Sequence, residues 1–154
     1  GDMAGLVERD VEVWDQGGGD LGERLERNLR RALEGSSFAL AVGADSPGLP
    51  ARLLLEARAA LERSDAVLGP CHDGGFYLLG LTRCPEQLLA GLPWSSRQTC
   101  ARTFERLEGV GLRTAFVEPW FDVDRPRDLV RLRRLLAGGE LRAPATLAVL
   151  RRGS

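Results

Sequence analysis

The stretch Asp122-Val123-Asp124-Arg125-Pro126-Arg127-Asp128-Leu129 decides the fold, because it places two carboxylates between an apolar strand and a helix. A second acidic corner, Gly43-Ala44-Asp45-Ser46-Pro47-Gly48-Leu49-Pro50, also follows an apolar run and precedes a helix. If both strands lie in one sheet, Asp45, Asp122 and Asp124 converge at one edge, where open α/β sheets bind ligands. We expect these acids to hold a divalent metal against the phosphates of a nucleotide.

Apolar runs of strand length alternate with helical patterns along the chain. Leucines recur every four residues from Leu21 to Leu33 behind the capping-box pair Asp20 and Glu23, which predicts an amphipathic helix. Strands are predicted over 11–14, 38–42, 66–68, 76–81 and 114–117, and further helices over about 51–61, 85–90, 97–107 and 126–136. This alternation predicts one α/β domain over 1–154, with a mostly parallel sheet covered by helices on both faces.

Composition excludes several classes of protein. The 154 residues are 44% hydrophobic and 28% charged, as in an ordinary globular domain, and the net charge of -1 gives no attraction to nucleic acid. Every one of the 21 basic residues is arginine, which excludes lysine chemistry. No apolar run is long enough for a membrane span. Cys71, Cys84 and Cys100 lack CxxC spacing, which favours reduced thiols and a cytoplasmic protein.

Each acidic corner also has a purely structural interpretation. An acid ahead of Pro126 can cap the next helix, and the Asp-Ser-Pro-Gly sequence at 45–48 is ordinary turn chemistry. One acid is enough for a cap, so the residues alone leave capping and metal binding equally open for the Asp122 and Asp124 pair. A hydrolase triad is disfavoured, because Ser46 lacks the G-x-S-x-G elbow and the chain has 1 histidine.

The glycine run offers a rival hypothesis. Gly17, Gly19 and Gly22 fit the G-x-G-x-x-G pattern of a dinucleotide-binding Rossmann domain, and Asp45 lies roughly where its ribose-binding acid would. The predicted strand at 11–14 is polar at alternate positions, however, whereas the first strand of that fold is buried on both faces. The Rossmann hypothesis also gives no function to Asp122 and Asp124.

Five motifs recur together, in this order, in a known group of proteins. They are Gln16-Gly17-Gly18-Gly19-Asp20-Leu21-Gly22-Glu23-Arg24, the 43–50 corner, Gly69-Pro70 with Asp73-Gly74-Gly75-Phe76-Tyr77-Leu78-Leu79-Gly80-Leu81, Pro93-Trp94-Ser95, and Asp122-Val123-Asp124 with Pro126 and Asp128-Leu129. Together they resemble bacterial GT-A-like transferases of the nucleotide-diphospho-sugar transferase superfamily. Those proteins are related to 2-phospho-L-lactate guanylyltransferase and molybdenum-cofactor nucleotidyltransferases, and are often labelled glycosyltransferases. The resemblance spans roughly Trp14 to Leu136.

The resemblance implies a GT-A-like fold that uses Mg²⁺ or Mn²⁺. By motif position, the catalytic and metal-binding acids would be Asp45, Asp122 and Asp124. The residues near the base or ribose of a nucleotide or nucleotide sugar would be Gln16, Gly17, Gly18, Gly19 and Leu21. The residues facing a small-molecule acceptor would be Asp73, Gly74, Gly75, Phe76 and Tyr77. In such chemistry the metal bridges phosphate oxygens while an acceptor oxygen attacks phosphorus, or the anomeric carbon if a sugar is transferred.

The chain departs from this family in two places. Arg125 and Arg127 stand where the family usually has a threonine and an acid. Nothing before Val11 supplies the family's first buried strand and its glycine- and basic-rich phosphate loop, so the domain looks amino-terminally truncated. A fragment, a start-site error and a catalytically inactive form kept for assembly or interaction all remain open. A missing strand would expose apolar surface that a second copy of the chain could cover, giving a homo-oligomer.

Overall fold

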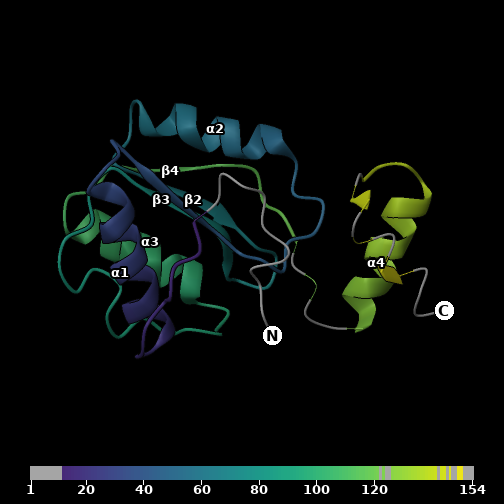
Figure 1. Ribbon diagram of the computed structural model, residues 1–154, viewed down its shortest axis with the longest axis horizontal. Helices are drawn as coiled ribbons and strands as arrows, with labels where there is room; N and C mark the ends of the chain where they lie inside the picture. The colour runs from purple at the N-terminus through teal and green to yellow at the C-terminus, as the bar shows by residue number, and fades with distance from the viewer. Residues whose placement is uncertain are drawn as a thin grey trace.

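The computed structural model describes residues 12–121, 123, 126–141, 143, 144, 146, 149 and 150. In this part of the chain the order of elements is α1 (Leu21–Leu33), β1 (Ala39–Val42), α2 (Ala51–Leu61), β2 (Ala66–Pro70), β3 (Phe76–Leu81), α3 (Thr99–Gly109), β4 (Thr114–Phe116) and α4 (Pro126–Ala137). Figure 1 shows the strands at the centre, with α2 on one side of them and α1 and α3 on the other. The predicted α/β class and the helices on both faces are therefore confirmed.

The sheet is mixed, so the prediction of a mostly parallel sheet is wrong. Its strand order is β1-β3-β2-β4. β3 pairs antiparallel with both β1 and β2, and β2 pairs parallel with β4. The reason lies in the connection from β2 to β3, because loop 71–75 is far too short for the crossover that two parallel strands need. β1, β2 and β4 consequently run in one direction, and their carboxyl ends share an edge with the amino end of β3.

The core divides into two layers, one on each face of the sheet. On one face Leu29 of α1 and Leu107 of α3 pack in a cluster with Leu68, Leu79 and Leu81. On the other face α2 covers the sheet with Leu53, Ala57 and Leu61, in a cluster that also contains Val67 and Leu78. Neighbouring residues of β2 thus serve opposite layers, as the alternation of side chains along a strand requires.

Two helices begin where local signals predicted. α1 follows a complete capping box, in which the Glu23 N–H donates to Asp20 Oδ1 over 2.9 Å and the Asp20 N–H donates to Glu23 Oε2 over 2.8 Å. α2 begins directly after Pro50, whose fixed φ suits a helix start. β1 is an edge strand, and Val42 at its end is 44% exposed.

Three local predictions need correction. The described residues 12–14 form no strand. Residues 86–90 form turns instead of the predicted helix, because Gln87 takes a left-handed φ of 60° that a right-handed helix cannot include. α3 begins at Thr99, later than predicted, and its N-cap residue Gln98 makes no side-chain cap bond. Two residues before it, the Ser96 hydroxyl accepts a hydrogen bond from the Gln98 N–H over 3.1 Å.

The segment after β4 turns back toward the acidic corner that follows β1. Phe121, Leu132 and Leu141 form a third apolar cluster. Leu141 packs close to Gly48, where a Cβ would lie 2.6 Å from its Cγ. Figure 1 shows α4 at the side of the sheet and its helices. Among the described residues, no helix combines the length and the apolar character that crossing a bilayer would require.

Candidate functional site

A cleft of about 510 Å³ lies where β1 ends and β3 begins. It is bordered by the segment before α1, the face of α1, the end of β1, the 71–75 loop and the 94–99 segment. Its lining residues are Gln16, Leu21, Leu25, Ala41, Val42, Gly43, Ala44, Asp45, Asp73, Gly75, Phe76, Tyr77, Trp94, Ser95, Ser96 and Thr99. Segments far apart in sequence therefore meet in one space of a size typical for small-molecule sites.

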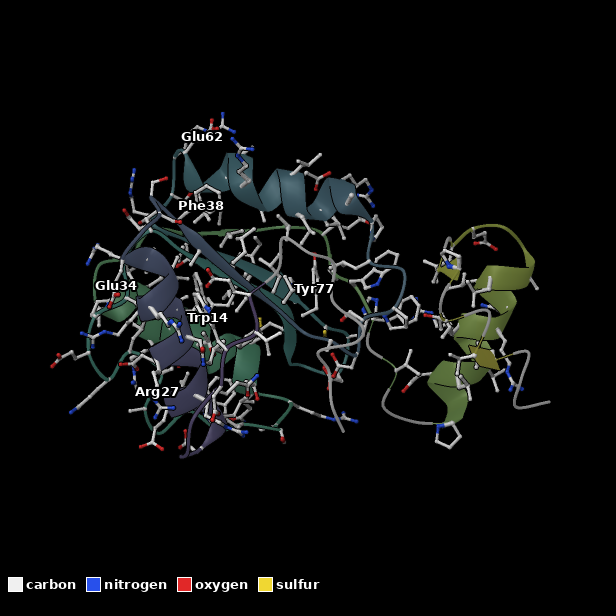
Figure 2. The ribbon with its side chains drawn as sticks, viewed as in Figure 1. Trp14, Arg27, Glu34, Phe38, Glu62 and Tyr77 are labelled. Atoms are coloured by element: carbon white, nitrogen blue, oxygen red, sulfur yellow. The ribbon has the colours of Figure 1, made fainter. Side chains whose placement is uncertain are left out.

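The predicted nucleotide-binding stretch reaches the cleft through Gln16 and Leu21, whereas Gly17, Gly18 and Gly19 do not line it. The glycine turn is held to α1 instead, because the Arg27 guanidinium donates to the carbonyl oxygens of Gln16 and Gly18. Figure 2 shows Arg27 on α1. The turn is therefore preformed beside the cleft.

The Rossmann alternative finds no support in this region. Gly22, the last glycine of the pattern, packs inside the protein, where a Cβ would lie 2.5 Å from the Leu89 carbonyl oxygen and 2.9 Å from Trp94 Nε1. The described residues 12–14 provide no strand ahead of the glycines. Close packing of α1 against the 89–94 segment explains why residue 22 is glycine.

Asp45 lies on the cleft, and its carboxylate folds back over Gly43, where a Cβ would lie 2.7 Å from Asp45 Oδ1. The Val123 N–H donates to the Asp45 carbonyl oxygen over 3.0 Å, so the two acidic corners of the sequence meet at Val123. Asp122 and Asp124, predicted as metal ligands, lie outside the described residues. Within the described part of the chain, no three His, Cys, Asp or Glu side chains gather closely enough to hold a metal ion.

The 71–75 loop, predicted to face the acceptor, both lines the cleft and contacts the start of α3. Asp73 and Gly75 line the cleft, and Asp73 Oδ1 accepts a hydrogen bond from the Gly75 N–H over 2.8 Å. Gly74 does not line the cleft. It has a φ of 97°, and a Cβ there would overlap the carbonyl group of Arg97. The Cys100 N–H donates to the Gly74 carbonyl over 2.9 Å, which docks the loop on the start of α3. The glycine at position 74 thus permits the close approach of the loop to the backbone of residue 97.

The two predicted aromatic residues differ in their surroundings. Phe76 lines the cleft and meets Trp94 edge to face, with ring centroids 6.1 Å apart. Tyr77, labelled in Figure 2, packs its ring on Gly69, and its hydroxyl donates to the Glu118 carbonyl over 2.9 Å. Burial is the main cause that raises the pKa of Tyr77 to about 12. Tyr77 is therefore a neutral structural element of the cleft wall.

The site also contains residues that the sequence did not assign. They are Leu25, Ala41, Val42, Gly43, Ala44, Trp94, Ser95, Ser96 and Thr99. Trp94 and Ser95 belong to Pro93-Trp94-Ser95, the fourth of the five motifs, and that motif was the available signal. Ser95 has a left-handed φ of 56°, which is uncommon outside glycine and recurs at functional sites.

The fold and the cleft define a mixed α/β domain with a ligand-sized site at the edge where β1 ends and β3 begins. The chain belongs to the bacterial family described as "Uncharacterized protein conserved in bacteria (DUF2064)", whose family model matches residues 1–96. It is similar to the crystal structure of a "putative nucleotide-diphospho-sugar transferase" from Desulfovibrio desulfuricans G20, with 33% identity and a TM-score of 0.65. That similarity covers 71% of this chain and 48% of the other, so the chain spans about half the length of that structure. The comparison with curated proteins found no match.

Proposed function

We propose that the protein is a nucleotide-using transferase that transfers a glycosyl group from a nucleotide-diphospho-sugar to a small-molecule acceptor with the help of Mg²⁺ or Mn²⁺. One observation carries the proposal: Gln16, Asp45 and Asp73, assigned to three different parts of such a site, line one cleft. The similarity to a structure named as a nucleotide-diphospho-sugar transferase supports the same class. Nucleotidyl transfer, in which the acceptor attacks phosphorus, is the alternative chemistry for this site.

Each side of the cleft has its own role in this proposal. Gln16 and Leu21 would contact the base or ribose, while Asp73 and Phe76 would contact the acceptor. Asp45 suits a metal, because its exposed carboxylate supplies the hard oxygen ligand that Mg²⁺ and Mn²⁺ prefer. Asp122 and Asp124 are proposed as its companion ligands. A bound metal would neutralise the diphosphate as it leaves.

Glycosyl transfer makes defined demands on these residues. The acceptor oxygen forms a bond to the anomeric carbon, the bond from that carbon to the diphosphate oxygen breaks, and the diphosphate leaves with the electron pair. The acceptor must therefore be held within bonding reach of the sugar and lose its hydroxyl proton. Asp73 lines the cleft and is proposed to orient that hydroxyl and take up its proton.

Calorimetric titration with Mn²⁺ and UDP-glucose tests the proposal, with GTP as the probe for nucleotidyl transfer. Asp45→Asn should weaken metal-assisted binding by about tenfold or more, equivalent to about 1.4 kcal/mol. Glu62→Gln is the matched control, because Glu62 is exposed at the end of α2, away from Tyr77 and the cleft (Figure 2). Equal binding by all three proteins would refute the metal role of Asp45. No binding of either nucleotide by the wild type would refute nucleotide use and favour a non-catalytic assembly domain.

A further inference from the structure

The acceptor side of the cleft joins an aromatic wall to carboxylates and hydroxyls. We propose that it selects a non-phosphorylated acceptor with an apolar ring face and several hydroxyl groups, such as a sugar or a cyclic polyol, and rejects a phosphorylated one. The inference rests on the proposed function, because it names the acceptor class of the same site. The wall, the charges and the hydroxyls each contribute an independent argument.

The aromatic wall is built from Phe76 and Trp94 and is continuous with the core that contains Leu25. Trp94 turns its nitrogen away from solvent, because Nε1 is buried against Gly22 of α1 and has no hydrogen-bond partner among the described residues. Its position is further fixed by the edge-to-face contact with Phe76. A rigid apolar wall of this kind packs well against the C–H face of a ring, since the aromatic face carries partial negative charge.

The charges of the cleft oppose an anionic acceptor. Among the described lining residues, each charged side chain is an aspartate, Asp45 or Asp73. The guanidinium of Arg27 lies nearby, but it binds the carbonyl oxygens of Gln16 and Gly18. A phosphate group beside Asp73 would therefore meet like charge, whereas a hydroxyl donates a charge-assisted hydrogen bond to a carboxylate. Asp73 uses Oδ1 for the Gly75 N–H, which leaves Oδ2 to receive such a hydroxyl.

The hydroxyls come from a turn that is held in place before any ligand binds. Thr99 Oγ1 lies 2.6 Å from the carbonyl oxygen of Pro93 and 2.8 Å from that of Ser96, which ties the turn to the start of α3. Ser95 is exposed on this turn in its left-handed conformation. Ser96 Oγ accepts from the Gln98 N–H and keeps its own proton to donate. Neutral donors and acceptors of this kind match the hydroxyls of a sugar.

Saturation-transfer NMR on the full chain can test this selection with matched triplets. One triplet is glucose, glucosamine and glucose 6-phosphate, and another is myo-inositol, its amino analogue and myo-inositol 1-phosphate. We expect the uncharged member of at least one triplet to bind, with its phosphate ester at least about tenfold weaker, a difference of about 1.4 kcal/mol. The amino member should bind at least as well as the uncharged one, because the two aspartates attract its ammonium group. Preference for a phosphorylated member, or no binding by any member, would overturn the inference.

Variants separate the contributions to this binding. Trp94→Ala should abolish binding of the uncharged compound, and Trp94→Phe should retain most of it because the wall stays aromatic. Trp14→Ala is the control, because Trp14 does not line the cleft. Its ring packs under the Arg31 guanidinium, with 4.0 Å between the ring centroid and Arg31 Cζ. Asp73→Asn should narrow the difference between the uncharged compound and its phosphate ester. An unchanged difference in Asp73→Asn would contradict the electrostatic argument.

The outcomes also distinguish this inference from the proposed function. Binding of UDP-glucose with Mn²⁺, without binding of any uncharged ring compound, would overturn the acceptor class and leave the transferase proposal standing. Binding of an uncharged ring compound without any nucleotide binding would overturn the transferase proposal instead.

Discussion

Gly74 is the point where the 71–75 loop packs against the start of α3, so Gly74→Ala tests how rigidly the cleft is built. The glycine has a φ of 97°, and its carbonyl accepts a hydrogen bond of 2.9 Å from the Cys100 N–H. A Cβ at this position would overlap the carbonyl group of Arg97. The obstacle is backbone, which cannot rotate away as the end of a flexible side chain would.

The expected cost has two parts, and the chain contains a control that isolates one of them. A left-handed φ costs an alanine about 1–2 kcal/mol, and forcing an extra carbon into packed atoms adds about 1–3 kcal/mol. Gly74→Ala should therefore lower the free energy of unfolding by about 2–5 kcal/mol in total. Gly91 has a φ of 67° but nothing within 4 Å of a Cβ, so Gly91→Ala carries only the first cost.

Urea unfolding of the wild type and both variants, followed by tryptophan fluorescence, measures the two costs. The slope of free energy against urea should stay constant while the midpoint falls further for Gly74→Ala than for Gly91→Ala. Equal losses in the two variants would show that the backbone at residue 97 yields, and would refute the idea of a rigid junction between the loop and α3.

Three other features give measurable predictions. Tyr77 is the single tyrosine of the chain, so the ultraviolet absorbance of its phenol should report an ionisation midpoint near 12 instead of 10. The free energy of unfolding should fall as the pH rises between these values, because the phenol ionises first in the unfolded chain. Glu26 accepts hydrogen bonds from two backbone N–H groups of the 86–90 turn, and Glu26→Ala should cost about 2–3 kcal/mol in urea unfolding, with Glu26→Gln costing less. Hydrogen bonds from Arg113 lower the pKa of Asp65, so an NMR titration should give a pKa below the ordinary 3.8, and Arg113→Gln should raise it. The contribution of Asp65 to the free energy of unfolding should be lost as the pH falls through its lowered pKa.

Local sequence signals predicted the elements whose causes are local. The capping box at Asp20 and the proline at 50 sit next to the helices they start, so α1 and α2 were predictable. The 86–90 turn was not, because its determinants lie far away in the sequence. Glu26 of α1 binds its N–H groups, and Arg106 of α3 donates to the carbonyl oxygens of Gln87, Leu88 and Ala90. These partners hold a turn where the local pattern favoured a helix.

In the candidate site, too, the sequence predicted some residues from local motifs and missed features that depend on distant packing. Asp45, Asp73 and Phe76 were predicted from motifs and do meet in the cleft. Trp94 was part of one of the five motifs, but the role proposed for it depends on the packing of Gly22 against its nitrogen edge, which no pattern in the sequence predicts. A motif can therefore point to a residue without showing which of its faces will meet a ligand.

The antiparallel direction of β3, which the prediction of a mostly parallel sheet missed, determines which residues meet at the site. β1 and β3 pair antiparallel with Val42 opposite Leu78, so the amino end of β3 lies beside the carboxyl end of β1. This arrangement brings Phe76 to the same edge as Asp45. In a parallel pairing Leu81 would occupy that edge, and Phe76 would lie at the far end of the strand, about 3.3 Å further for each residue. The short 71–75 loop, by forcing β3 to return, is thus the feature that joins the proposed acceptor side of the cleft to the proposed metal side.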